Sequence, residues 1–389
     1  MQPGREAVVG GGFGGVKAAL ELSKRQLGKI TLISDESYFL HHATLYATAT
    51  GKAIEESVIP LQDIFQHHPD VTVVQDVMKS IDTQRKLVIG KNKQYDYDTL
   101  ILSIGSVTTY FGVKGMAKHA YGIKSLEEIR RFQDHIKQEV VTNKLDKEFF
   151  VIGAGPTGVE LAGALNEYLQ QLISVHRLKN SRARVTIVEA ASRILPRSSK
   201  TASRIVLERL REVGIRVYVN QKVEALDENH ITIQGKKVTT TTAVWTSGVA
   251  NNPFFAKHPD MFHLAENGRV NVNPYLEALP HVYVIGDSNS VKYSGMAWPA
   301  FHQAIFVAKH LTRVKSHRPH AAYRPHSVMS GLPVGDKWGY VEWLGIYVAG
   351  RPGYWVRRWM ELYGYAQLVP LKKALQIWRA HDISEIDET

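Results

Sequence analysis

The chain has 389 residues, long enough for two or three domains with substantial cores, and it contains no cysteine. The lack of cysteine excludes a redox-active disulfide, a thiolate nucleophile and any cysteine-ligated metal or iron–sulfur cluster, so electron transfer would need a bound organic cofactor. The formal net charge of +11 favours an anionic partner, which could be nucleic acid, an acidic membrane or phosphorylated ligands.

A glycine-rich turn follows the first apolar strand and precedes a helix expected over residues 16–24. Its three spaced glycines form a GxGxxG pattern, in which the first permits a tight bend, the second admits a diphosphate and the third lets helix and strand pack. We expect a dinucleotide here, although a plain strand-to-helix turn would use the same pattern. The expected ligand-binding residues of this turn are Gly10, Gly12, Phe13, Gly14 and Gly15.

The next strand is expected over 29–33, and its end should carry an acid that binds a ribose hydroxyl. Ser34 occupies that position, with Asp35 and Glu36 directly behind it. We predict that one of these two acids binds the ribose, although each would also suit a solvated strand end.

The segment 38–51 has no clean period and should form a loop with a short helix over the cofactor. His41 and His42 lie in it without the nearby carboxylate or third histidine of a metal site, so we predict no metal. A helix with a capping-box start is expected at 125–137. Further strands are expected at 71–74, 86–89 and 97–104, the last ending at Gly105.

The opening pattern then recurs, with a strand at 149–152, a second GxGxxG turn and a long helix at 159–172. The next strand, 184–188, ends in Glu189, which is placed to bind both ribose hydroxyls and to repel a 2′-phosphate. Two such units in order predict two dinucleotide sites, the second preferring NADH over NADPH. The expected ligand-binding residues of the second turn are Gly153, Gly155, Pro156, Thr157 and Gly158.

Strand-like patterns follow at 236–245, 270–272 and 281–285. The last of them ends in Gly286 and Asp287. Beside two nucleotide sites, Asp287 is interpreted as a ligand of the ribityl or phosphate region of a flavin, with a simple turn residue as the alternative.

Together these motifs resemble the two-dinucleotide-binding flavoproteins, and within them the type II NADH:quinone oxidoreductases. The strings that carry the resemblance are YDTLILSIGSVTTYFG at 97–112, HAYGIKSL at 119–126, EAASRILP at 189–196, VWTSGV at 244–249 and VYVIGD at 282–287. The resemblance implies an α/β fold with two Rossmann-like domains, the NADH domain inserted into the FAD domain. It gives 1–113 and 247–325 to FAD, 114–246 to NADH and 326–389 to a C-terminal region for membrane association or dimerisation.

The resemblance also implies roles for single residues. The first turn, Gly105, Asp287 and Ala297 would bind FAD, and the second turn and Gly248 would bind NADH. Glu160 would lie beside nicotinamide and flavin, unless it is only a first-turn acid favoured by the helix dipole.

The helix that lines the quinone pocket in that family corresponds here to AWPAFHQA at 297–304. Gln303 fits the family pattern, whereas Trp298 and His302 replace two expected glutamines. His302 could donate a proton to reduced quinone, or be a packed or solvated histidine.

From about residue 327 the composition becomes aromatic and basic, with amphipathic helices expected at 355–363 and after Pro370. The aromatic face of the first helix contains Trp355, Trp359, Leu362 and Tyr363, and the residues expected outside it are Arg357, Arg358 and Glu361. These helices could pack on the FAD domain or a second subunit. We favour an interfacial membrane anchor with basic rims, compatible with a homodimer.

No apolar run reaches the length of a spanning helix, and no signal-peptide pattern precedes the first strand. We therefore predict a peripheral enzyme on the cytoplasmic face of the inner membrane. It would pass two electrons from NADH through FAD to menaquinone or ubiquinone without pumping protons. The alternatives are a reductase of a soluble electron-carrier protein, and a flavin-binding protein with a mainly binding role. Scattered basic residues argue against nucleic acid.

Overall fold

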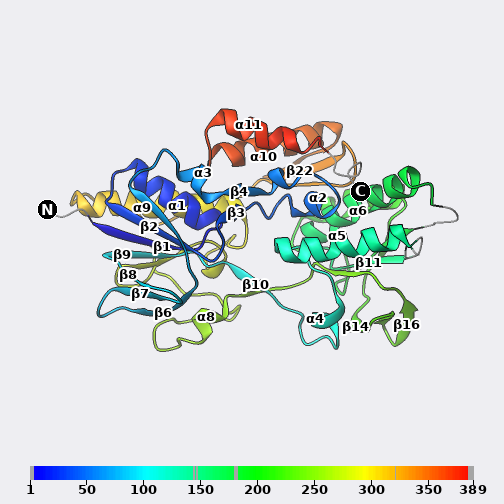
Figure 1. Ribbon diagram of the computed structural model, residues 1–389, viewed down its shortest axis with the longest axis horizontal. Coiled ribbons are helices and arrows are strands. Elements are labelled where there is room, and N and C mark those ends of the chain that lie inside the picture. The colour runs from blue at the N-terminus through cyan, green and yellow to red at the C-terminus, as the bar shows by residue number, and fades with distance from the viewer. Residues whose placement is uncertain (1–3, 143–144, 146–147, 179–182, 320, 384–389) are drawn as a thin grey trace.

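The computed structural model describes residues 4–142, 145, 148–178, 183–319 and 321–383. Figure 1 shows two α/β bodies side by side, with the C-terminal helices lying across the top of both. Each body is built on a largely parallel sheet. In each sheet the carboxyl end of one strand leads directly into a glycine-rich turn.

The first body contains a six-stranded sheet in the order β19-β20-β9-β1-β2-β5, in which only β19 runs antiparallel to its neighbour. Helices α1 (Phe13–Lys24) and α9 (Ala297–Lys315) pack against each other on one face, and the small sheet β6-β7-β8 covers the other. The strands are β1 (Arg5–Val9), β2 (Lys29–Ser34), β5 (Val71–Gln75), β6 (Met78–Asp82), β7 (Leu87–Gly90), β8 (Gln94–Asp96), β9 (Thr99–Leu102), β19 (Glu277–Leu279) and β20 (Val282–Val284).

The second body contains a four-stranded parallel sheet in the order β13-β12-β11-β17 and an antiparallel sheet β14-β15-β16. Its helices are α5 (Leu126–Val141), α6 (Pro156–Val175) and α7 (Lys200–Glu212), and α5 begins with the predicted capping box. The strands are β11 (Glu148–Ile152), β12 (Arg184–Val188), β13 (Arg216–Tyr218), β14 (Val223–Leu226), β15 (His230–Ile233), β16 (Lys236–Thr239) and β17 (Ala243–Trp245).

Two chain crossings join the bodies, and they pair as the antiparallel strands β10 (Ser106–Thr108) and β18 (Val249–Asn251). The segment 38–60 also reaches between the bodies and forms the predicted short helix, together with a strand pair that was not predicted. The elements of this segment are β3 (Tyr38–Leu40), α2 (Leu45–Ala49), η1 (Ile54–Glu56) and β4 (Val58–Pro60). Short helices elsewhere in the chain are α3 (Leu61–Phe65), α4 (Met116–His119) and α8 (Pro253–Ala256).

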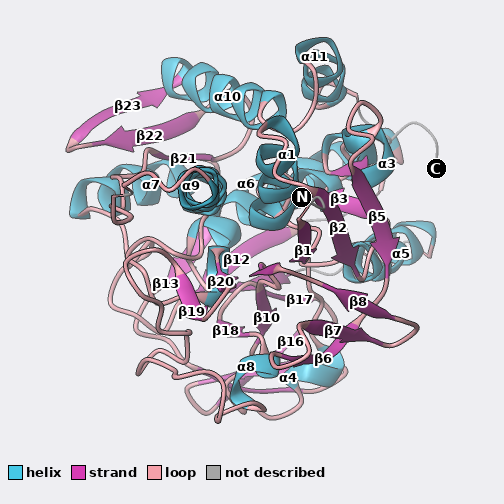
Figure 2. Cartoon of the chain, turned by 90° about the vertical axis from the view of Figure 1, so that its left-hand side faces the viewer, coloured by secondary structure: helices cyan, strands magenta, loops and turns pink. Residues whose placement is uncertain are grey.

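The C-terminal region forms a small sheet, β21 (Ser330–Pro333), β22 (Gly339–Trp343) and β23 (Ile346–Gly350), followed by α10 (Arg351–Ala366) and α11 (Leu371–Ala380). Figure 2 shows α10 beside β22 and β23 at the edge of the molecule. None of the helices in the described part of the chain combines the length and apolarity needed to cross a bilayer.

Two strand predictions were wrong. The expected strand at 236–245 is divided into β16 and β17, which belong to different sheets. At 270–272 only isolated bridges form, from Val270 to Leu264 and Asn289, because the neighbouring backbone turns away after one pair. Of the basic loop expected at 176–184, residues 179–182 lie outside the described residues, as do 384–389 of the tail.

Candidate functional site

The first glycine turn joins β1 to α1 with the geometry of a diphosphate cradle. Gly10 has a φ of 113°, which favours glycine. A Cβ atom on Gly15 would lie 1.9 Å from the carbonyl oxygen of Gly10, so strand and helix can approach this closely only without a side chain. A Cβ on Gly12 would meet no described atom within 4 Å. The second glycine therefore leaves room for an anion at the helix N-terminus.

The second turn repeats this geometry between β11 and α6. Gly153 has a φ of 106°, and a Cβ on Gly158 would lie 1.9 Å from the carbonyl oxygen of Gly153. A Cβ on Gly155 would again meet no described atom within 4 Å. Pro156 and Thr157 are exposed in the first helical turn, where proline fits because its missing N–H is not needed. Both turns therefore fit the diphosphate of a dinucleotide.

The strands that follow the two turns end differently. Glu189, after β12, accepts a hydrogen bond at Oε2 from the backbone N–H of Ala154 at 2.7 Å, so its carboxylate lies beside the second turn. After β2, Ser34 is buried, whereas Asp35 and Glu36 are exposed. Glu36 borders a cavity of about 710 Å³ between this strand end and α5.

Asp287 lies in the short turn η2 (Gly286–Ser288) after β20, among groups from distant segments. Ser106 Oγ donates to Asp287 Oδ2 at 2.9 Å, and Lys124 Nζ donates to the carbonyl oxygen of Ser106 at 2.8 Å. Burial lowers the pKa of Lys124, and the charge of Asp287 partly opposes this. Gly105 has a φ of 67° and open space where a side chain would lie. A carboxylate, an ammonium group and an open backbone thus meet at one place.

Sequence reasoning missed Ser106, Lys124 and His42 as members of this group. His42 is exposed to solvent, yet protein surrounds it densely enough for desolvation to lower its pKa, as in the wall of a cleft. Lys124 lowers that pKa further and Asp287 raises it, so both charges act on His42. Ser106 and Lys124 lie in the strings 97–112 and 119–126, but only the fold brings those segments to Asp287.

The start of α9 supports the same turn. Ala297 begins the helix, and Gln303 is fully buried. Gln303 Oε1 accepts from the backbone N–H of Gly286 at 2.7 Å and from Asn289 Nδ2 at 2.8 Å. Gln303 therefore holds the turn that carries Asp287, and its contact with an electron acceptor stays a prediction.

His302 belongs to an aromatic group that joins α9 to α10. Its ring centroid lies 5.7 Å from that of Trp298 and 5.3 Å from that of His326. Trp298 in turn lies 5.1 Å from Tyr363 of α10. Burial, with a smaller effect of His326, lowers the pKa of His302, so the ring is neutral at pH 7.

Gly248 lies just before β18, with a φ of 80°. A Cβ there would come 2.4 Å from the ring of Phe111. The Phe111 ring therefore packs close to Gly248, where a side chain would clash with it.

Glu160 is buried in the first turns of α6, and Oε1 lies 3.9 Å from Nη2 of Arg357 on α10. Burial raises the pKa of Glu160 to about 8, with Arg357 opposing and Glu361 adding to the shift. The side chain is therefore mostly protonated at neutral pH. No hydrogen bond, ion pair or ring contact within the described ranges joins Glu160 to His302.

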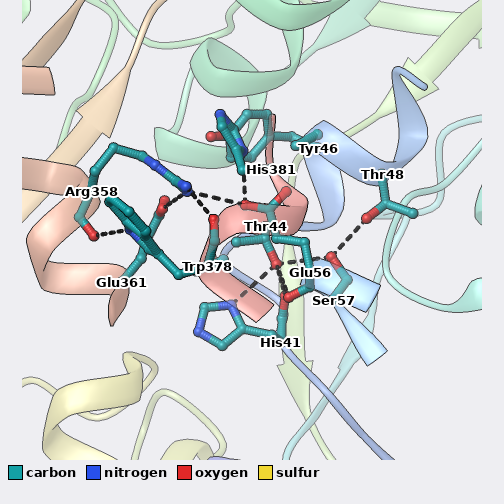
Figure 3. Close-up of polar contacts among 12 residues, drawn as sticks. His41, Thr44, Tyr46, Thr48, Glu56, Ser57, Arg358, Glu361, Trp378 and His381 are labelled. Atoms are coloured by element: carbon teal, nitrogen blue, oxygen red, sulfur yellow. Dashed lines mark hydrogen bonds and ion pairs between the residues drawn. The ribbon is translucent and has the colours of Figure 1, made fainter. Parts of the chain in front are cut away.

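Beyond Glu160 the charges continue as a buried ionic cluster, most of which Figure 3 shows. Arg357 Nη1 lies 2.8 Å from Glu361 Oε1, and Arg358 pairs with the other oxygen of the same carboxylate. Arg358 also lies 3.4 Å from Glu56 of η1, and His381 Nδ1 lies 2.8 Å from the same Glu56 oxygen. The cluster fastens α10 and the end of α11 to the segment between the two bodies.

This cluster shows which face of α10 is packed. The charged residues Arg357, Arg358 and Glu361 lie outside the aromatic face, as predicted, but they are buried, at 6%, 3% and 3% exposure. The aromatic residues Trp355 and Trp359 are instead 53% and 62% exposed. The reason is that Glu56 and Glu160 lie in the interior beneath α10, so the buried side of the helix carries the arginines that pair with them, and His381 is a further partner of Glu56.

Comparison with known proteins agrees with this architecture. Residues 5–304 match the family model described as pyridine nucleotide-disulphide oxidoreductase. The chain is 31% identical to the type II NADH:quinone oxidoreductase NdhA of Mycobacterium tuberculosis, over 79% of this chain and 72% of that protein. This chain belongs to the pyridine nucleotide-disulphide oxidoreductase family.

Within this family the chain is similar to the type II NADH:quinone oxidoreductases. The Staphylococcus aureus protein of that name is 27% identical over 79% of this chain and 81% of its own length. The structure of NDH2 from Plasmodium falciparum in complex with NADH has the same fold, with a TM-score of 0.85, 16% identity and 98% coverage of both chains. As a cysteine-free member of the pyridine nucleotide-disulphide oxidoreductase family, this chain lacks the disulfide of the family name.

Proposed function

We propose that this protein is an FAD-dependent NADH:quinone oxidoreductase that does not pump protons. The observation that carries the proposal is the repeated open glycine cradle, one in each body, in a chain without cysteine. The curated relatives named type II NADH:quinone oxidoreductase support it. FAD, when bound, would accept a hydride from NADH and pass on two electrons.

The proposal divides the binding residues between two nucleotides. In the FAD domain, 1–113 and 247–325, the first turn would hold the diphosphate, and Asp287 with Ser106 and Lys124 would bind the middle of the cofactor. Gly105 and Ala297 would give the flavin close access to backbone, and Glu36 or Asp35 would lie near the adenosine. This fit rests on the open glycines and on the polar group at Asp287.

In the NADH domain, 114–246, the second turn would bind the diphosphate and Glu189 the ribose, with Gly248 at the crossing. Selectivity for NADH over NADPH is supported by the nearby Arg193, because its guanidinium is already used. It donates to the backbone carbonyl oxygens of Leu195, Pro196, Ser198 and Ser199. A 2′-phosphate would therefore meet the Glu189 carboxylate, and Arg193 would not be free to pair with it.

The quinone would enter by the aromatic group of α9 and α10, where Trp298 and Tyr363 could stack on a flat ring. His302 lies at the same place and Gln303 behind it. Glu160, protonated at neutral pH, could supply a proton close to the nicotinamide. The sequence and geometry support menaquinone and ubiquinone equally.

We further propose that the C-terminal region, 326–389, docks on the cytoplasmic face of the inner membrane. The support is an exposed apolar surface on β22, β23, α10 and α11, which comprises Trp343, Leu344, Ile346, Tyr347, Trp355, Trp359, Tyr363 and Leu371. Aromatic side chains favour the membrane interface, and each nearby Lys or Arg adds about 1 kcal/mol on an anionic surface. A homodimer could share this surface.

The experiment that tests the electron path is an anaerobic absorption spectrum of the purified protein. NADH should bleach a bound flavin, and a pulse of short-chain quinone should restore the oxidised spectrum rapidly. Bleaching without recovery would reject quinone as the acceptor and leave the nucleotide sites standing. A protein without flavin absorbance that also fails to bind added FAD would reject the proposal as a whole.

Membrane docking has its own test, co-sedimentation with vesicles that contain anionic lipid. The double substitution W355S/W359S should abolish most of the binding, because both rings are exposed and their loss leaves the core intact. The control is Tyr218→Ser, which removes an exposed aromatic ring from the second body, outside the proposed surface. The buried Trp245 would not serve as a control, because its substitution would disturb the core. Equal binding by all variants would contradict the proposed surface.

A further inference from the structure

Four buried polar side chains form a continuous chain of hydrogen bonds next to the ionic cluster. His41 Nδ1 lies 3.2 Å from Thr44 Oγ1, which lies 2.8 Å from Ser57 Oγ. Ser57 Oγ lies 2.7 Å from Thr48 Oγ1. Figure 3 shows the four side chains in this order, and all four are buried. A row of hydroxyls that ends on an imidazole is a path along which a proton can move, because each member both donates and accepts.

One end of this row lies near solvent. Thr48 lines a cavity of about 170 Å³, together with residues of α5 that include Arg130 and Gln133. Gln133 Nε2 donates to the backbone carbonyl oxygen of Thr48 at 2.8 Å. The lining combines polar side chains with the aliphatic Ile54, Leu126 and Ile129, and the cavity has room for water, so a proton could enter the row at the Thr48 hydroxyl.

The other end faces the proposed acceptor site. The His41 ring lies 5.2 Å from Phe13, the first residue of α1, and 4.8 Å from Tyr365 of α10. Phe13 packs in turn on Phe301 of α9, at 5.5 Å. A Cβ built on Gly364 would lie 3.9 Å from His41 Nε2 and near no other described atom. The second ring nitrogen thus faces the side-chain position of Gly364 on α10, and the ring contacts through Phe13 and Phe301 lead from His41 to Trp298 of the proposed acceptor site.

We propose that Thr48, Ser57, Thr44 and His41 form a proton wire that delivers one proton from water to the quinone. The inference rests on the proposed function. Reduction of a quinone by NADH needs one proton from solvent, since NADH supplies two electrons and one proton and the quinol contains two protons. His41 Nε2–H would give this proton to a quinone oxygen, and the wire would replace it.

The transfer leaves no charge on the protein. The Thr48, Ser57 and Thr44 hydroxyls each pass a proton to the next oxygen, and Thr44 gives one to Nδ1 while His41 loses one from Nε2. Burial holds the pKa of His41 at about 3, so the ring works by exchanging its two neutral forms rather than by forming a cation. After the transfer the hydrogen lies on Nδ1, so before the next turnover the ring must return to its Nε2–H form by taking a proton from water at the acceptor site and releasing the Nδ1 proton to the row. The Thr44 hydroxyl can then donate to the backbone carbonyl oxygen of His41, at 2.9 Å.

The test compares Thr44→Val, which removes the hydroxyl at constant shape, with Thr44→Ser, which keeps it. Two acceptors are used with each variant. A short-chain quinone takes up a proton from solvent, whereas ferricyanide accepts electrons and takes up none. We expect Thr44→Val to lower kcat with quinone at least about tenfold, the scale of a lost proton donor, and to leave ferricyanide reduction unchanged. Thr44→Ser should stay close to the wild type with both acceptors.

Thr48→Val and Thr48→Ser repeat the comparison at the solvent end, which keeps the test valid should a Thr44 variant fold poorly. The control is Thr50→Val, because Thr50 is also buried but donates to the carbonyl oxygen of Tyr46 and lies outside the wire. Equal quinone kcat values for the Val and Ser variants at both sites would overturn the wire. A wild type that reduces ferricyanide but no quinone would instead overturn the proposed function, and the wire with it.

Discussion

The two glycine turns are followed, two residues after the third glycine, by buried ionisable side chains of opposite type, a lysine in the first body and a glutamate in the second. In α1 this residue is Lys17, which pairs with Glu21 at 3.0 Å and donates to the Gln367 side chain at 3.2 Å. In α6 it is Glu160, which faces Arg357. Glu160 therefore meets Arg357 in the first half of α10, and Lys17 meets Gln367, the residue that follows the helix.

The comparison teaches that α10 contacts both bodies through a buried ionisable side chain that follows each glycine turn. Its first half supplies a cation to the second body, and the residue after its last turn supplies an amide to the first. A buried charge is stabilised only when its partners are in place, so the relative position of the bodies depends on the C-terminal helix.

The largest expected effect comes from breaking each turn separately with Gly15→Ala and Gly158→Ala. Each new Cβ would lie 1.9 Å from a backbone oxygen, so unfolding free energy should fall by about 5 kcal/mol or more in the body concerned. Gly15→Ala should abolish flavin absorbance. Gly158→Ala should keep the flavin absorbance and lose only its bleaching by NADH.

The matched controls are Gly12→Ala and Gly155→Ala, whose Cβ atoms enter open space. They should change the free energy of unfolding by only about 1 kcal/mol while weakening nucleotide binding. Loss of flavin from Gly158→Ala together with its NADH response would show that the two turns do not act separately.

Removing a central cation should have the next largest effect. Arg358→Met leaves Glu56 and Glu361 buried without this partner, so chemical denaturation should show a loss of about 3 to 5 kcal/mol. Arg204→Met, which breaks an exposed pair with Glu208, is the control and should cost about 0.5 kcal/mol. Similar losses in the two variants would mean that burial of the cluster contributes little.

Glu160→Gln should change how stability depends on pH. In the folded protein the pKa of Glu160 is about 8, raised from 4.5 by burial, so the folded state binds more protons than the unfolded state between these values. The stabilisation is complete below pH 4.5 and is lost as pH rises through 8. Relative to the variant, the wild type should lose about 3 kcal/mol between pH 5 and pH 7.5. Parallel stability curves for the two proteins would place the pKa near its ordinary value.

The smallest effect concerns the two strand ends. Glu189→Gln should lower the preference for NADH over NADPH about tenfold in kcat/KM, because it removes the carboxylate that repels a 2′-phosphate. Glu36→Gln at the corresponding end of the first body should leave this preference unaltered. A change of preference in the second variant would reverse the assignment of the two turns.

The sequence was sufficient where neighbouring residues determine the geometry. The glycine turns, the strand 184–188 and the capping box of α5 follow local rules, and the structure contains them as predicted. Lys124, Ser106 and His42 were out of reach, because their contact depends on three separate segments. The pattern of α10 separates its aromatic side from its charged side, but it could not show that the charged side is buried, because it does not reveal Glu56 and Glu160 beneath the helix.

The buried cluster also has a consequence for how the protein is made. Glu56 and Glu160 leave the ribosome long before their partners, because Arg357 and Arg358 follow Glu160 by about two hundred residues. The two bodies must therefore wait, incompletely closed, until α10 has been synthesised. A stop codon before α10 would remove far more than a surface for docking, since it would leave the buried Glu56 without its cationic partners and Glu160 without Arg357.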